Sequence, residues 1–336
     1  MRVARLHGVA DLRLTDEPLP EVPPGHSLVR VTAVGLCGSD LHWYSEGGIG
    51  DARLGRPLVI GHEFAGVVER GPSTGSRVAV DPAMPCESCE LCREGHPNLC
   101  PNIRFCGHGS VDGALREFVA WPSHLLHVLP DGLSDNDGAM LEPLGVAIHA
   151  VDLGHLRVGA SVAVLGCGPV GLLVLQVARI AGATTVVAVD PLRHRREAAR
   201  RLGADVVAAP DEVRDPDSAV WRAGDRYGVH TAFEVAGTDD AVGLAVAAAR
   251  PGGRVVLAGI PDDDRTSFPA SHARRKGLTI LMSRRMKDVY PRAIDLWRSG
   301  RVDVRSLVSA AYPLEKVGEA FPAAAARTGL KVVVNP

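Results

Sequence analysis

Four cysteines within fifteen residues, Cys86, Cys89, Cys92 and Cys100, constrain this chain more than any other feature of its sequence. Four thiolates at such short spacing fill the tetrahedral shell of a metal ion and leave no open position for a substrate. A pair of disulfides is the alternative, but it requires an oxidising compartment. The cluster therefore predicts a structural zinc that holds a loop together and takes no part in chemistry.

The rest of the sequence favours a reducing compartment. The N-terminal segment is charged and lacks the apolar run of a secretory signal, and no stretch is apolar enough to span a bilayer, so we expect a cytoplasmic protein. A net charge of -2 and a pI near 6.7 give no electrostatic footprint for nucleic acid or for an anionic membrane. A small molecule is the expected partner.

The chain of 336 residues is long enough for two domains. Up to about Leu129 its segments are short, β-branched and interrupted by glycine and proline, which predicts a β-rich part. From Ser161 onward, apolar strands alternate with alanine-rich helices, the pattern of a parallel sheet with crossover helices. Six strands are predicted at 161–165, 185–189, 205–208, 231–235, 254–257 and 278–282, with helices at 172–181 and 239–249. The expected class is α/β with a β-rich part and a doubly wound sheet.

A glycine-rich turn follows the first of these strands. Gly166, Gly168 and Gly171 supply a tight turn, a close approach to a pyrophosphate and close packing of helix on strand, with Cys167, Pro169 and Val170 between them. The N-terminus of the next helix attracts phosphate groups. Placed between a strand and a helix, this Gly-x-Gly-x-x-Gly motif predicts a dinucleotide site.

Asp190 ends the second strand, 19 residues after Gly171. A carboxylate there accepts hydrogen bonds from the adenosine ribose and repels a 2′-phosphate, which favours NAD over NADP. Arg195 and its basic neighbours leave NADP as the alternative, because one of them could pair with a phosphate if Asp190 turned away. Val235, Gly259 and Ile260 follow later strands and are predicted to line the nicotinamide pocket.

A second metal site is predicted outside the cysteine cluster. Cys37 and His62 supply the thiolate and imidazole that catalytic zinc sites use, and Glu63 and Glu142 compete for the remaining place. A zinc with few protein ligands keeps an open position and, as a Lewis acid, lowers the pKa of an alcohol hydroxyl group. Hydride can then pass to the nicotinamide.

Several motifs occur together in one order: GLCGSDLH at 35–42, GHEFAG at 61–66, the four cysteines, and GCGPVG at 166–171. With these motifs the chain resembles the zinc-dependent medium-chain dehydrogenases over nearly its whole length. The stretches LHWYSEGG at 41–48 and LEPL at 141–144 are similar to the branch of sorbitol (L-iditol), xylitol and L-idonate dehydrogenases.

The resemblance implies a GroES-like catalytic domain over 1–147, a six-stranded Rossmann domain over 148–283, and a C-terminal return to the catalytic domain over 284–336. It implies Cys37, His62 and Glu63 as ligands of the catalytic zinc, with Glu142 as a nearby exchanging carboxylate. Ser39 and His42 match the family's proton relay, and relatives form dimers and tetramers. The positions that face the sugar chain in polyol dehydrogenases are matched by Tyr44, Phe105, Glu142 and Arg285.

The substrate stays open between two classes. An arginine such as Arg285 can bind several hydroxyl groups, but it also pairs well with the carboxylate of a sugar acid such as L-idonate. The run RRMK at 284–287 resembles the polyol enzymes more, so we expect oxidation of a polyol to a ketose. An alternative of another class is a zinc protein that senses a nucleotide without turnover, because fold alone does not establish activity.

Overall fold

The computed structural model describes residues 1–215, 218, 220–223 and 226–336, which form two compact units. Unit 1 consists of Met1–Glu142, Tyr290–Arg298 and Val304–Pro336, and unit 2 consists of Pro143–Val289 and Ser299–Asp303. The domain limits expected from the sequence, after residues 147 and 283, remain predictions.

Unit 1 is built on a sheet of seven strands in the order β11-β7-β6-β3-β19-β18, with β10 also paired to β3. These strands are β3 (His26–Gly35), β6 (Glu63–Arg70), β7 (Arg77–Val80), β10 (Phe118–Pro122), β11 (Leu126–Val128), β18 (Val308–Pro313) and β19 (Lys331–Asn335). Three two-stranded ribbons are formed by β1 (Arg2–Gly8) with β2 (Asp11–Asp16), β4 (Gly48–Ile49) with β5 (Ala52–Arg53), and β8 (Ala83–Met84) with β9 (Arg104–Phe105).

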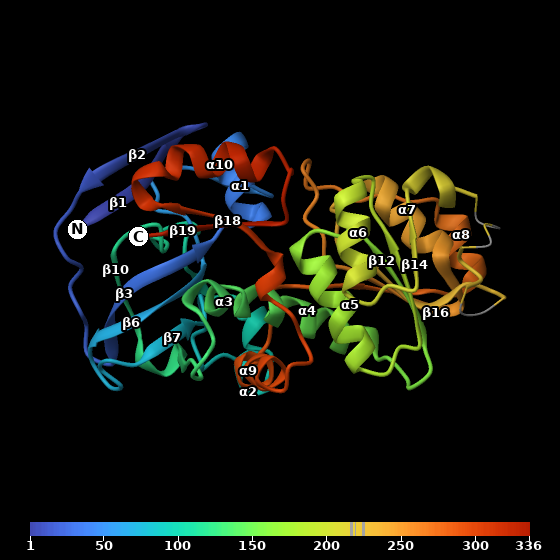
Figure 1. Ribbon diagram of the computed structural model, residues 1–336, viewed down its shortest axis with the longest axis horizontal. Coiled ribbons are helices and arrows are strands. Elements are labelled where there is room, and N and C mark those ends of the chain that lie inside the picture. The colour runs from blue at the N-terminus through green and yellow to red at the C-terminus, as the bar shows by residue number, and fades with distance from the viewer. Residues whose placement is uncertain (216–217, 219, 224–225) are drawn as a thin grey trace. The chain divides into compact units, whose positions relative to one another are not determined.

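The helices of unit 1 are short. They are α1 (Gly38–Glu46), α2 (Glu90–Arg93), α3 (Asp135–Ala139), α9 (Tyr290–Arg298) and α10 (Val317–Ala325), and α4 (Leu141–Gly154) leads into unit 2. The last strand, β19, is buried and lies beside β3, so the C-terminal segment completes the sheet that begins with β3, as Figure 1 shows.

One pairing in this sheet positions the candidate site. β3 and β6 are antiparallel, with Gly35 opposite Glu63, so the end of β3 and the start of β6 lie side by side. The motifs at 35–42 and 61–66 meet at this point. A Cβ on Gly35 would lie 2.3 Å from Glu63 Oε2, so only glycine lets the carboxylate approach this closely.

Unit 2 contains a six-stranded sheet in the order β14-β13-β12-β15-β16-β17, in which every pairing is parallel. The strands are β12 (Ser161–Leu165), β13 (Thr185–Val189), β14 (Val206–Ala208), β15 (Val229–Glu234), β16 (Ala249–Leu257) and β17 (Thr279–Met282). Helices α5 (Pro169–Ile180), α6 (Arg193–Arg201), α7 (Asp239–Ala248) and α8 (Ala270–Lys276) flank the sheet (Figure 1). The predicted fold class, a β-rich part and a six-stranded Rossmann sheet, is confirmed.

The helix after the glycine motif corrects one detail of the prediction. Helix α5 begins at Pro169 and not at Leu172, so the second half of the glycine motif forms the first helical turn. Proline suits the first position of a helix because the amide N–H it lacks would have no partner within the helix. The motif therefore places the helix N-terminus at Gly168 itself.

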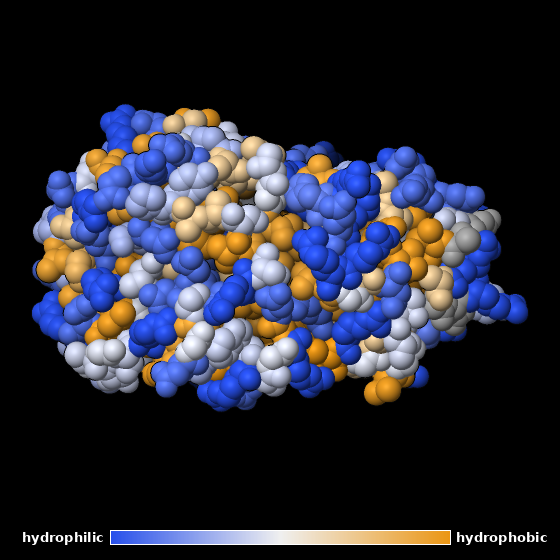
Figure 2. All heavy atoms as spheres, in the orientation of Figure 1, coloured by the Kyte–Doolittle hydropathy of each residue, from blue (hydrophilic) through white to orange (hydrophobic). Residues whose placement is uncertain are grey.

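Helix α6 carries the basic run that left the cofactor preference open. Its residues Arg193, Glu197, Arg200 and Arg201 are exposed, whereas Ala198 and Ala199 are buried against the unit. The surface over α6 is accordingly hydrophilic in Figure 2.

Among the described residues, no helix has both the length and the apolar composition needed to cross a membrane.

Candidate functional site

Cys37, His62 and Glu63 lie together in unit 1. Cys37 precedes helix α1, and the other two residues stand at the start of β6. One potential ligand atom from each residue lies within 4.8 Å of the other two, and both His62 and Glu63 are buried. Residues 25 positions apart in the sequence thus converge on one point.

Asp40 holds these two segments together. Its Oδ2 accepts a hydrogen bond of 3.0 Å from the Cys37 N–H, and its Oδ1 accepts one of 3.0 Å from the Gly61 N–H. His62 Nδ1 lies 3.5 Å from the same Oδ1, which leaves Nε2 as the ring nitrogen available to a metal. Burial lowers the pKa of His62, but Asp40 and Cys37 together raise it by more, so the pKa lies well above its ordinary value. The sequence analysis assigned no role to Asp40.

Lys331, which the sequence analysis also missed, forms a buried ion pair with Glu63. Its Nζ donates hydrogen bonds of 2.8 and 2.6 Å to the two carboxylate oxygens and one of 3.1 Å to the Leu36 carbonyl. The two side chains are 3% and 1% exposed, so the pair is shielded from water. The signal in the sequence is a lone lysine at the head of an apolar strand.

Glu142 stands in the first turn of α4 and is also buried. Burial raises the pKa of Glu142 to about 7, Glu63 adds to the rise, and His62 and Lys331 oppose it. Glu142 therefore belongs to the same group of charged residues. A bound divalent cation would lower this pKa, because an opposite charge favours the carboxylate.

This donor set fits a zinc ion. A thiol, an imidazole and a carboxylate are the ligand types of zinc, and three protein ligands leave one tetrahedral position open. The closely packed set Cys37, His62 and Glu63 does not include Glu142. The roles of all four residues at a metal remain proposals.

The four cysteines of the cluster form a second, separate group around α2 and the following turn. Their sulfur atoms lie within 4.8 Å of one another, with separations of 3.4 Å (Cys89 to Cys92), 3.5 Å (Cys86 to Cys100) and 3.9 Å (Cys89 to Cys100). A tetrahedron of thiolates around zinc has sulfur separations of about 3.8 Å. All seven cysteines of the chain are free, so no disulfide competes.

The pKa values of two of these thiols are shifted in opposite directions. Backbone N–H groups of Ser88 and Cys89 lower the pKa of Cys86 to about 5. Desolvation and the neighbouring thiols of Cys89 and Cys100 raise the pKa of Cys92 to about 12. Four thiolates so close together require a cation, because each negative charge raises the pKa of the next.

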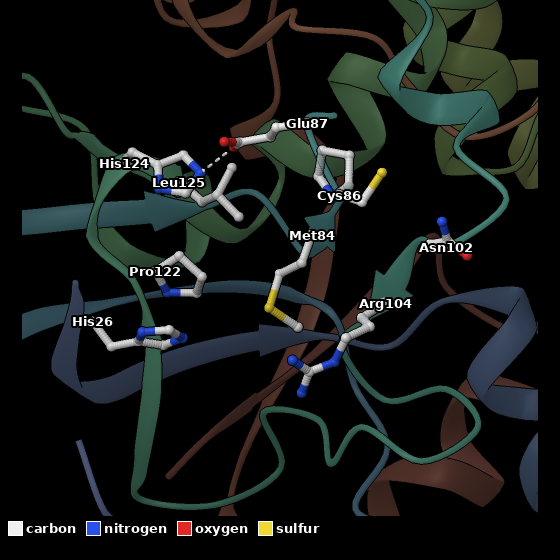
Figure 3. Close-up of a pocket in the computed structure, with 10 residues that line it drawn as sticks. His26, Met84, Cys86, Glu87, Asn102, Arg104, Pro122, His124 and Leu125 are labelled. Atoms are coloured by element: carbon white, nitrogen blue, oxygen red, sulfur yellow. Dashed lines mark ion pairs between the residues drawn. The ribbon is translucent and has the colours of Figure 1, made fainter. Parts of the chain in front are cut away.

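A pocket of about 300 Å³ lies beside this cluster, and Cys86 forms part of its wall. The Glu87 carboxylate lies 2.8 Å from His124 Nε2. Figure 3 shows this ion pair as a dashed line on one side of the pocket, with the side chains of Met84 and Arg104 on another. The pocket includes none of the candidate catalytic ligands.

The remaining site candidates of unit 1 are Ser39, His42, Tyr44 and Phe105. Ser39 and His42 lie on α1, and His42 Nδ1 is 3.0 Å from Glu46 Oε1. The ring of Phe105 packs 5.2 Å from that of His62, so the structure brings it to the ligands. Tyr44 instead packs 4.8 Å from the ring of Phe321 on α10. Arg285, in unit 2, has a left-handed backbone with φ of 54°.

In unit 2, the predicted cofactor residues meet at the carboxyl edge of the sheet. Gly166 N–H donates to the Val189 carbonyl at 2.8 Å, and Val235 N–H donates to the Leu165 carbonyl at 2.8 Å. A Cβ on Gly171 would lie 1.9 Å from the Gly166 oxygen, so the helix packs on the turn as expected for this motif. Residues 166 and 168–170 are partly exposed, which leaves the turn accessible to phosphate groups.

Two buried carboxylates fix this edge. Asp190 accepts N–H groups of Cys167 and Leu192, each at 2.8 Å. Glu234 ends β15, and its Oε1 accepts the N–H groups of Ala236 and Gly237, each at 2.7 Å. The sequence analysis assigned no role to Glu234, although an acid at the end of an apolar strand is the signal that identified Asp190. Gly259 and Ile260 follow β16 at the same edge, where Gly259 N–H donates to the Glu234 carbonyl at 3.1 Å.

Known proteins share this architecture. A family model for the alcohol dehydrogenase GroES-like domain matches residues 23–131, and one for the zinc-binding dehydrogenases matches residues 169–299. Sorbitol dehydrogenase of Bacillus subtilis is 34% identical over 344 residues, which cover 100% of this chain and 97% of that protein.

Two solved structures extend the comparison. L-idonate 5-dehydrogenase from Escherichia coli is 28% identical with a TM-score of 0.92, covering 100% of this chain and 98% of that one. A protein from Sinorhizobium meliloti 1021, solved bound to NADP, is 31% identical with a TM-score of 0.90 over 100% and 99% of the two chains. The chain belongs to the zinc-binding dehydrogenases with a GroES-like domain, and the predicted enzyme class, an oxidoreductase of the alcohol dehydrogenase type, is confirmed.

Substitution of one cysteine in each of the two proposed metal sites should have different effects on stability and turnover. Both Cys37→Ala and Cys92→Ala should lower the zinc content from about two ions per chain to about one, measured by atomic emission. Cys92→Ala should also lower the melting temperature by roughly 10 °C, because a structural metal contributes to folding. Cys37→Ala should abolish turnover with little change in melting temperature. Equal zinc content in wild type and Cys37→Ala would contradict a ligand role for Cys37.

Proposed function

We propose that the chain oxidises a secondary alcohol of a polyol to a ketose, with NAD as hydride acceptor and two zinc ions per chain. One observation supports the chemistry above all: a thiol, an imidazole and a carboxylate converge in a set of three, apart from a separate set of four cysteines. An open zinc site serves catalysis and a closed one serves structure. The similarity to sorbitol dehydrogenase supports the polyol.

The proposed catalytic site uses the chain's own residues in distinct ways. When bound, zinc supplies Lewis-acid polarisation that lowers the pKa of a hydroxyl group. Cys37, His62 and Glu63 hold the ion, and Asp40 keeps the His62 ring oriented. Ser39 and His42 carry the released proton away from the substrate. His42 suits the outer end of this relay, because its side chain is 15% exposed and its Nδ1 faces the exposed carboxylate of Glu46.

A sugar acid is the second candidate substrate. The similarity to L-idonate 5-dehydrogenase over the whole chain favours it, and the guanidinium group of Arg285 would pair with its carboxylate. In either case Tyr44, Phe105, Glu142 and Arg285 are the proposed substrate residues. A nucleotide-sensing protein without turnover is disfavoured, because the relay residues Ser39 and His42 accompany the ligand set.

The working protein is proposed to be a cytoplasmic homo-oligomer, a dimer or a tetramer. Seven free cysteines suit a reducing compartment. Strand β17 is an edge of the six-stranded sheet, and its Met282 is 69% exposed, so a second copy could pair there. Light scattering of the purified protein should give two or four times the chain mass of 35.4 kDa, and a monomer at micromolar concentration would contradict this proposal.

The activity is tested by a substrate screen on the zinc-loaded protein. We expect NAD reduction with sorbitol, xylitol or iditol at rates at least tenfold above those with simple primary alcohols, followed by absorbance at 340 nm. Idonate is included to separate the two candidate substrates. The absence of activity with every polyol and aldonate would refute the proposed function.

The preference for NAD is attributed to Asp190. Its two oxygens are already fixed by backbone N–H groups, so it does not turn away readily, and Arg195 Nη1 lies 3.9 Å from Oδ2. Asp190→Ala removes charge-assisted hydrogen bonds to the ribose, so kcat/KM for NAD relative to NADP should fall by about 10-fold to 100-fold. Asp205→Ala, which removes a carboxylate that pairs with Arg179 and accepts the Val186 N–H, serves as a control that keeps Asp190. An unchanged ratio in Asp190→Ala would contradict the assignment.

A further inference from the structure

The buried ion pair between Lys331 and Glu63 does more than neutralise a charge. Lys331 Nζ has three hydrogens, and the structure provides three acceptors: both oxygens of Glu63 and the Leu36 carbonyl. The backbone bond from Leu36 N–H to the Val332 carbonyl, 2.9 Å long, fixes β19 beside this group. The ammonium group therefore has a set position and no unused donor.

Glu63 is confined by this arrangement from two sides. Both of its oxygens are engaged by the ammonium group at 2.6 and 2.8 Å. The backbone of Gly35 lies so close to Oε2 that a single added carbon would collide with it. The Glu63 carboxylate therefore has one orientation relative to Cys37 and His62, and the Lys331 ammonium group balances part of its negative charge.

The same ion pair lowers the negative charge at the site. Cys37 as a thiolate, Glu63 and Glu142 together offer a metal ion up to three negative charges. A carboxylate that donates electron density to an ammonium group is a weaker metal ligand, because the groups bonded to a ligand tune its basicity. A weakly bound ligand can exchange while the other ligands hold the metal ion.

We propose that Lys331 is a positioning residue that keeps Glu63 a weak, exchangeable ligand of the catalytic metal. This inference rests on the proposed role of Cys37, His62 and Glu63 as metal ligands. It adds a residue from the last strand of the chain to the control of that site. A residue that only supports a ligand would have the opposite effect on metal affinity. Loss of such a partner typically lowers the affinity about 10-fold to 100-fold.

The test is Lys331→Met, with zinc affinity measured by competition with a chelator in the absence of substrate. Without the ammonium group, the Glu63 carboxylate should bind the metal more strongly. The zinc affinity of the site that contains Cys37 should therefore rise about tenfold or more. In cobalt-substituted protein, the visible d–d absorption should weaken as the coordination number rises, and kcat should fall. Unchanged or lower affinity with an unchanged cobalt spectrum would overturn the proposal.

Two further variants keep the test valid if Lys331→Met folds poorly, which circular dichroism would reveal. Lys331→Arg retains a cation that can bind both oxygens, so its cobalt spectrum should stay close to that of the wild type. Glu63→Gln removes the charge of the ligand itself, and its zinc affinity should fall only a few fold if Glu63 is a weak ligand. A loss of 100-fold or more in Glu63→Gln would overturn the proposal by showing that Glu63 binds tightly.

These readouts separate the inference from the proposed function. Zinc affinity and cobalt spectra are measured without substrate, so both results can be interpreted even if the protein oxidises no polyol. If cobalt gives no thiolate charge-transfer band that depends on Cys37, the proposed metal site itself fails. If that band is present and the Lys331 variants leave affinity and spectrum unchanged, only the role of Lys331 fails.

Discussion

A single buried carboxylate determines the geometry of the candidate catalytic site. Asp40 is 1% exposed, and it accepts N–H groups from both Cys37 and Gly61, so the turn after β3 and the turn before β6 are held in fixed relation. A carboxylate left without these partners would be costly to bury. Asp40 can make both hydrogen bonds only if the two turns lie side by side, and this places the Cys37 thiol beside the His62 imidazole.

Other buried charged groups in the chain are stabilised in the same way, by ion pairs or by backbone hydrogen bonds. Lys331 and Glu63 satisfy one another in the interior of unit 1, and Asp190 and Glu234 each accept two backbone N–H groups at the edge of the sheet in unit 2. Buried charges are retained only when they are paired or hydrogen-bonded. In this protein they stand beside the predicted metal and dinucleotide sites, where rigid geometry serves binding and catalysis.

The sequence predicted what depends on local spacing. The four cysteines, the glycine turn and the alternation of strands and helices are all contained in short windows, and the fold class follows from them. Asp40 and Lys331 escaped because their roles depend on distant partners: Lys331 is 268 residues from Glu63. Glu234 is different, because it accepts N–H groups only two and three residues ahead, and its place at the end of an apolar strand could have identified it. Tyr44 shows the same limit, since its packing against Phe321 arises from the return of the C-terminal segment to unit 1.

The central claim is that one chain holds two metal ions in different environments, one closed and one open. X-ray absorption at the zinc edge, combined with a crystal structure of the zinc-loaded protein phased on the metal, tests it most directly. The account predicts one ion bound by four sulfur atoms and a second bound by Cys37 sulfur, a His62 nitrogen and oxygen. A single zinc ion per chain, or a second ion that contacts neither Cys37 nor His62, would contradict it.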